Sequence, residues 1–114
     1  MGQTEGDLYA LRLARRRMLV VGAAMSDPAA AWSNGIARSS MTGALAILGI
    51  KGAGTLNLIR RGTAVDPENA GPCATLNFAG VTSILYRHSE ALRLHFDRGL
   101  TAYMQSWISA TDLF

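Results

Sequence analysis

The sequence predicts an all-α protein that forms a single domain over residues 1–114, and three observations support this prediction. Two long segments carry almost no charge, small residues are abundant, and the last third places apolar and charged residues on opposite sides of a helix. Ala and Gly fill 30 of 114 positions (18 Ala and 12 Gly), which favours close approach of backbones. Hydrophobic residues make up 49% and charged residues 17%, which argues against a disordered chain.

The N-terminal third predicts two consecutive helices. Leucines recur among good helix formers over about residues 6–25, which indicates the first helix. Asp27 and Pro28 suit the N-cap and the first position of a second helix over about residues 28–48. Strands are not expected, because alternation of β-branched residues with polar ones is nearly absent.

Two nearly uncharged segments predict a central helical hairpin. The 21 residues between Arg38 and Arg60 carry only Lys51, and residues 69–86 carry no charge. As helices, both segments would be apolar on every side, which is typical of helices buried in an assembly or in lipid. The charged link between them, about residues 60–68, would form the tip of the hairpin.

Packing between subunits explains this hairpin better than a conventional membrane span. Lys51 would cost roughly 2.5–3.5 kcal/mol at a bilayer centre. Pro72 would shorten the second helix below a spanning length. Small residues at the helix contacts would let the backbones approach closely. The predicted helix-packing positions are Gly43, Ala46, Gly49, Ala53, Ala79 and Gly80.

The C-terminal third predicts a long amphipathic helix over about residues 84–109. Its charged residues fall on the side opposite an apolar stripe, and its length would be roughly 39 Å. A stripe of that length needs a partner surface, either the first helix or a neighbouring subunit, and we favour self-association. The predicted docking stripe consists of Leu85, Leu92, Phe96, Leu100, Tyr103 and Trp107.

Arginine dominates the positive charge and predicts a basic patch. The net charge is +3, from ten Arg and one Lys against eight acidic residues. Such a patch can meet phosphate, acidic lipid headgroups or an acidic protein. Nucleic acid is a less favoured partner than a second copy of the chain. The predicted patch consists of Arg12, Arg15, Arg16, Arg17, Arg60 and Arg61.

The sequence predicts no catalytic residue, no metal site and no cofactor, and therefore no enzyme. His88 and His95 would lie roughly 10 Å apart along one helix, too far to share a metal ion. The single cysteine, Cys73, excludes an internal disulfide and has no evident base beside it in the sequence. The glycines over residues 49–54 lack the order of a phosphate-binding loop.

Several short segments over about residues 39–86 form a recognisable pattern, namely Ser39–Gly49, Leu58-Ile-Arg-Arg61, Asp66-Pro67, Gly71-Pro72 and Phe78-Ala-Gly80. They resemble the small pilin-like helical-hairpin proteins of conjugative and type IVB secretion systems. The resemblance implies a helix, a basic pair, a short Pro-containing loop and a second helix rich in small residues.

The favoured function is that of a non-enzymatic structural subunit that self-assembles through helix packing, as part of a pilus, another filament or a secretion apparatus. The favoured location is the bacterial envelope or an extracellular filament, with the cytoplasm as the alternative. Contact with lipid or a membrane stays open. The alternative function is a small phage- or bacteria-encoded binding or adaptor protein that uses an Arg-rich helix against nucleic acid or an acidic protein.

Overall fold

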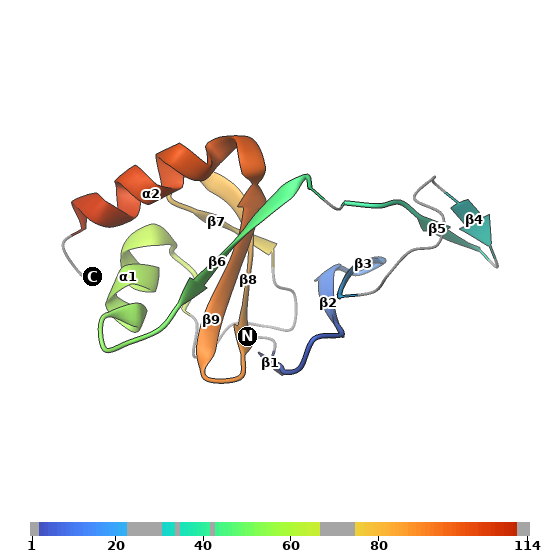
Figure 1. Cartoon of the computed structure of the whole chain (residues 1–114), viewed down its shortest axis with the longest axis horizontal. Helices are drawn as coiled ribbons and strands as arrows, with labels where there is room; N and C mark the ends of the chain where they lie inside the picture. Colours follow the sequence, from blue (N-terminus) through green and yellow to red (C-terminus); the bar gives the residue numbers. More distant parts are fainter. Residues whose placement is uncertain (1–2, 23–30, 34, 42, 67–74, 112–114) are drawn as a thin grey trace.

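A computed structural model of the chain shows a mostly β protein, so the all-α prediction is wrong. The structure describes residues 3–22, 31–33, 35–41, 43–66 and 75–111. Figure 1 shows a sheet that carries two helices at one end of the molecule and two small β-hairpins toward the other end. The molecule is elongated, with extents of 47 × 29 × 24 Å.

The central sheet has five strands and is organised around β8. Its order is β1-β8-β9-β6, and β7 pairs with the first half of β8 on the same side as β1. Only the short β1–β8 pairing is parallel. The strands are β1 (Gln3–Thr4), β6 (Leu45–Ile50), β7 (Thr75–Phe78), β8 (Val81–His88) and β9 (Ala91–Asp97).

Two helices cover one face of this sheet and form the hydrophobic core with it. α1 (Thr55–Gly62) follows β6, and α2 (Thr101–Ala110) follows β9 through a short 3-10 turn, η1 (Arg98–Leu100). Alternate residues of β8 and β9 point to this face, because side chains along a strand alternate between its two sides. The buried core residues are Ile50, Leu58, Ile59, Phe78, Val81, Leu85, Leu92, Leu94, Phe96 and Met104.

A β-hairpin contacts the opposite face of the sheet. It consists of β2 (Tyr9–Ala14) and β3 (Arg17–Val21), which pair antiparallel. Leu11 at its centre is buried, and the Thr75 hydroxyl donates to the Leu13 carbonyl at 3.0 Å. Both faces of the sheet are therefore at least partly covered, which explains why β8 is apolar on both sides.

A second hairpin stands away from the rest of the molecule (Figure 1). It pairs β4 (Ala31–Ser33) with β5 (Ile36–Arg38), and Gly35 in its two-residue turn has a φ of 75°. An Asn-Gly pair at residues 34–35 is typical of such turns, because both turn positions favour positive φ. This hairpin forms a projecting arm.

The predicted N-terminal helix over residues 6–25 and the second helix over 28–48 are both wrong. The described part of these ranges contains β2, β3, β4, β5 and most of β6. Good helix formers such as the Arg and Leu of β2 lie in a strand here, because contacts with the sheet override a weak local propensity. The cap assigned to Asp27 and Pro28 lies outside the described residues.

The central helical hairpin and the long C-terminal helix are also wrong. The first arm of the hairpin is β6 followed by α1, and the second arm contains β7 and most of β8. The range 84–109 contains the end of β8, then β9, η1 and most of α2. Leu92 and Phe96 are four residues apart, a spacing that places two side chains on one side of a helix and also on one side of a strand. That coincidence explains the incorrect helix.

The predicted charged tip is the end of α1 and the loop after it. Arg60 and Arg61 lie in the last turn of α1, while residues 67–68, Pro72 and Cys73 lie outside the described residues. Neither described helix combines the length and the apolar character needed to cross a bilayer.

Candidate functional site

Four polar side chains gather between the central sheet and the β2–β3 hairpin. Tyr86 on β8 lies opposite Arg93 on β9, and His95 lies two residues further along β9. These three side chains share one face of the sheet, because paired residues on neighbouring strands lie on the same face and so do residues two apart on one strand. Tyr9 at the start of β2 completes the group by reaching this face from the hairpin.

Short hydrogen bonds connect these four residues in one network, here called the tyrosine–histidine network. The Tyr86 hydroxyl lies 2.5 Å from the Tyr9 hydroxyl and 2.5 Å from Nε2 of His95. The Arg93 guanidinium donates to the Tyr9 hydroxyl at 3.0 Å and lies 6.0 Å from the centre of the Tyr9 ring. Tyr9 therefore receives both a charged hydrogen bond and a cation–π contact from Arg93.

Burial shifts the acid–base properties of the tyrosine–histidine network. Burial, with the positive charge of Arg93 as a second cause, lowers the pKa of His95 to about 4. Burial and the hydrogen bond with Tyr9 raise the pKa of Tyr86. The hydrogen bond to Tyr9 raises the pKa of Arg93. At neutral pH the network thus contains a neutral imidazole, a neutral Tyr86 and a charged guanidinium.

This network holds the hairpin on the sheet, and two of its members, Tyr86 and His95, are buried. Tyr86 is 0% exposed and His95 is 3% exposed, so a substrate cannot approach either group. Their polar atoms bond to one another, and no buried side-chain nitrogen or oxygen in the described residues lacks a partner. A neutral imidazole beside a phenol is common in proton-transfer sites, but such sites need contact with the reacting atoms.

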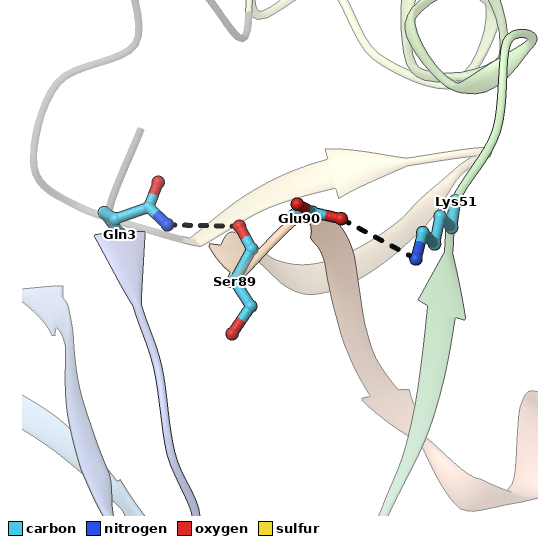
Figure 2. Close-up of polar contacts among 4 residues, drawn as sticks. All are labelled: Gln3, Lys51, Ser89 and Glu90. Carbon is cyan, nitrogen blue, oxygen red and sulfur yellow. Dashed lines mark hydrogen bonds and ion pairs between the residues drawn. The ribbon is translucent and has the colours of Figure 1, made fainter.

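A second group of polar contacts ties β1 to the turn between β8 and β9. The Thr4 hydroxyl donates to the Arg87 carbonyl at 2.9 Å and lies 3.0 Å from Nδ1 of His88. Figure 2 shows the Gln3 amide donating to the Ser89 carbonyl at 3.3 Å. The N-terminal strand is thereby fixed at the end of the sheet.

Figure 2 also shows an ion pair between Lys51 and Glu90 at 3.9 Å. Both side chains are largely exposed, so this pair contributes little to stability. Within the described ranges, no three His, Cys, Asp or Glu side chains come close enough together to hold a metal ion.

The predicted docking stripe is divided between the core and the surface. Leu85, Leu92 and Phe96 lie on β8 and β9 and are buried beneath the helices. Trp107 on α2 packs edge-on against Phe78, with ring centroids 5.3 Å apart. Leu85, Leu92 and Phe96 therefore form the inside of the fold, and Trp107 is partly buried against it.

The other two stripe residues, Leu100 and Tyr103, remain exposed on η1 and α2. The Tyr103 hydroxyl donates to the Ala79 carbonyl at 2.6 Å. Ala79 and Gly80, predicted as helix-packing positions, form the two-residue turn between β7 and β8, with φ values of 53° and 84°. Two positive φ values are typical of a type I′ hairpin turn.

The remaining helix-packing positions lie on or near β6. Gly43 precedes the strand with a φ of 82°, and Ala53 lies in the turn before α1. Ala46 packs against the core from β6, whereas Gly49 on the same strand is exposed. These small residues serve turns and a strand, and none of them forms a helix–helix contact.

The predicted basic patch is divided between two separate elements. Arg12, Arg15, Arg16 and Arg17 are exposed on the β2–β3 hairpin, and three of them lie at its turn. Arg60 and Arg61 lie on α1, and Arg61 donates to the Thr111 carbonyl at 3.2 Å. Figure 1 shows α1 and the hairpin on opposite sides of the sheet in this view.

Large apolar side chains remain exposed on three strands. Met18 and Val20 on β3 are 63% and 56% exposed, Ile36 on the arm is 62% exposed, and Ile47 on β6 is 53% exposed. Met18 and Val20 lie on the outer face of their hairpin, because Leu19 and Val21 between and beyond them are partly covered. These strands offer apolar surface outside the core.

The tyrosine–histidine network is not among the residues predicted from the sequence, although the sequence contains one signal for it. Leu92-Arg-Leu-His-Phe-Asp97 alternates strictly between apolar and polar residues, which is the pattern of a strand. Recognition of that strand would place Arg93 and His95 on one face. The approach of Tyr9 has no local signal, since it comes from a segment far away in the sequence.

Comparison of the chain with protein-family models, with curated proteins and with solved structures found no match.

Proposed function

We propose that this chain is a non-enzymatic assembly subunit that associates with further copies through its strands. The observation that carries the proposal is the exposure of Met18, Val20, Ile36 and Ile47 on three different strands. Apolar side chains exposed outside a core lose contact with water when a second subunit covers them, which favours association. The association predicted from the sequence used helix packing, but Leu58 and Ile59 of α1 and Met104 of α2 lie in the core.

The projecting arm supports the same proposal. The β4–β5 pairing is internal to the arm, and the arm extends away from the sheet in Figure 1. An isolated two-stranded hairpin is marginally stable in water, so contact with another subunit would stabilise it. A filament or secretion apparatus is the setting that the resemblance over residues 39–86 implies, and it belongs to the same proposal.

Light scattering coupled to size-exclusion chromatography tests this proposal. The wild-type chain is expected to have a molar mass that is a multiple of 12.1 kDa. The double variant Met18→Lys/Val20→Lys should dissociate or form smaller assemblies, because two charges replace apolar contacts. Asn57→Lys, at an exposed position of α1, is the matched control and should assemble normally. A wild-type chain that stays monomeric at every concentration would contradict the proposal.

A second candidate function is binding of a phosphate-bearing polymer by the β2–β3 hairpin. Arg15 and Arg16 form its turn, with Arg17 beside them and Arg12 on the adjacent strand, all exposed. A two-stranded β-ribbon fits the major groove of duplex DNA, and arginines contact the backbone phosphates. This geometry replaces the Arg-rich helix of the sequence analysis.

Fluorescence anisotropy with a labelled DNA duplex tests this second function. Changing Arg15, Arg16 and Arg17 together to Ala should weaken binding and reduce its dependence on salt, because fewer counterions are released. The matched control changes Arg60 and Arg61, on the other side of the sheet, to Ala. Equal affinities for the two variants would argue against the hairpin as the binding element.

A further inference from the structure

In the part of the chain that the structure describes, β6 leaves one edge of the central sheet open along its whole length. β6 is the last strand in the sheet order, and its partner within the described ranges is β9 alone. The Arg98 amide donates to the Ala44 carbonyl in register with this ladder. Since bonded pairs alternate in antiparallel strands, even-numbered residues of β6 bond to β9. The amide and carbonyl groups of Leu45, Ile47 and Gly49 therefore point away from the sheet.

This open edge lacks the features that usually protect an edge strand. The six residues of β6 carry no charge and no proline, and the first charge is Lys51, directly after the strand. Ile47 is exposed, and a Cβ atom added at Gly49 would meet no atom within 4 Å. An uncharged, regular edge of this kind is a template for another strand. Beside it, a shallow hollow is lined by Leu48, Leu58 and Ile108 among others.

We propose that this edge pairs antiparallel with β6 of a second copy, about a two-fold axis that passes through Leu48. The proposal deepens the assembly function above and rests on it. Only registers that match outward-facing residues of both copies can form hydrogen bonds. An axis at Leu48 pairs Ile47 with Gly49 of the second copy, and Leu45 with Lys51 of the second copy. An axis at Ile47 would pair Ile47 with itself and Leu45 with Gly49, and it would place Lys51 opposite Gly43, whose φ of 82° does not continue the strand.

The side chains in this register complement each other on both faces of the sheet. The exposed Ile47 lies across from Gly49 of the second copy, where the missing side chain leaves room for it. On the helix-covered face, Leu48 meets Leu48 of the second copy beside the apolar hollow. In this register the large residues Ile47 and Ile50 lie across from the small residues Gly49 and Ala46 of the second copy.

Charge complementarity also favours a second copy as the occupant. Lys51 of the second copy would lie beside Leu45, and Asp97 is the residue that pairs with Leu45 on β9. Asp97 and Lys51 of the second copy then share one face of the joined sheet, two strands apart. The long lysine side chain reaches across that distance. The present partner of Lys51 is Glu90, at 3.9 Å. Both side chains are largely exposed, so this ion pair competes only weakly with Asp97 for Lys51.

Cysteine cross-linking tests the register directly. In a Cys73→Ser background, Leu48→Cys should form a disulfide-linked dimer on mild oxidation, detected by intact mass without reductant. The two Leu48 Cα atoms would be roughly 4.5 Å apart in a non-bonded antiparallel pair, within disulfide range. Ala46→Cys is the control, because it faces Ile50 of the second copy. Its two Cα atoms would be roughly 13 Å apart, and no cross-link is expected.

Gly49→Pro provides a second variant that keeps the internal ladder with β9. It removes only the outward amide, so the circular dichroism spectrum should be unchanged while the dimer dissociation constant rises roughly tenfold or more. Equal cross-linking of Ala46→Cys, no cross-linking of Leu48→Cys, or an unchanged dissociation constant would overturn this register. If the Met18/Val20 variant dissociates while the β6 variants behave like wild type, the assembly function stands and the β6 interface is wrong. A monomeric wild type would contradict both.

Discussion

The Tyr9 hydroxyl lies 2.5 Å from the Tyr86 hydroxyl, although the two residues are 77 positions apart in the sequence. This contact joins the first hairpin to the central strand of the sheet. Two residues of β9 extend this contact. Arg93 donates a hydrogen bond to the Tyr9 hydroxyl, and His95 is hydrogen-bonded to the Tyr86 hydroxyl. These four side chains thus fasten the hairpin to the sheet, together with the buried Leu11 and the hydrogen bond from Thr75 to Leu13.

Tyr9→Phe removes the hydroxyl that bonds to both Tyr86 and Arg93 while keeping the ring. The free energy of unfolding should fall by roughly 1–3 kcal/mol, because buried polar groups lose a partner. Urea denaturation measures this change, and amide exchange in β2 and β3 should become faster. The control Leu8→Ala changes an exposed residue next to Tyr9 and should have little effect. Equal effects of the two substitutions would show that the hydroxyl does not fasten the hairpin.

Stability should depend on pH through His95. Its pKa is about 4 in the folded chain, below the ordinary value of 6.5, because burial and Arg93 disfavour the imidazolium. The unfolded chain therefore binds the proton first as pH falls. The stabilisation is complete above pH 6.5 and is lost between about pH 6.5 and 4, by up to about 3 kcal/mol.

Urea denaturation from pH 7.5 to 4 measures this dependence, and His95→Gln separates it from the titration of carboxylates. In the variant, the free energy of unfolding should no longer fall between pH 6.5 and 5, a range in which few carboxylates titrate. If the free energies of unfolding of the variant and the wild type change in parallel with pH, burial does not lower the pKa of His95.

Gly62 at the end of α1 leaves room for a buried ring. A Cβ atom at this position would lie 2.3 Å from the Phe78 ring, and Phe78 is fully buried. Gly62→Ala should therefore lower the free energy of unfolding by roughly 1–3 kcal/mol, because the core must shift. Thermal unfolding followed by circular dichroism measures the change. Asn57→Ala, an exposed position of the same helix, should remain within about 0.5 kcal/mol of wild type.

Ala79 is a site where a substitution should stabilise the protein. It has a φ of 53° in the turn between β7 and β8, a conformation that Asn tolerates better than Ala. Ala79→Asn should raise the free energy of unfolding by up to roughly 1 kcal/mol, and the hydrogen bond from Tyr103 to the backbone carbonyl is retained. Gly80→Ala, at a φ of 84°, should have the opposite sign. A loss of stability in Ala79→Asn would contradict the strain at this turn.

Parts of this architecture have visible signals in the sequence. The alternation over residues 92–97 and the Asn-Gly pair at residues 34–35 indicate a strand and a hairpin turn. The helical prediction failed because Leu92 and Phe96 are four residues apart, which suits either kind of element. An uncharged segment fits a helix that is apolar on every side, but in β8 it belongs to a strand with both faces at least partly covered.

What the sequence by itself determined is a folded chain with surplus apolar residues, a basic segment around residues 15–17 and alternating segments able to form strands. Only the tertiary structure decided that Leu85, Leu92 and Phe96 lie inside, that Ile47 lies outside, and that Tyr9 meets Tyr86. The physical reason is that burial depends on strand register and on which distant segment covers each face. Neither property is encoded in the local pattern of residues.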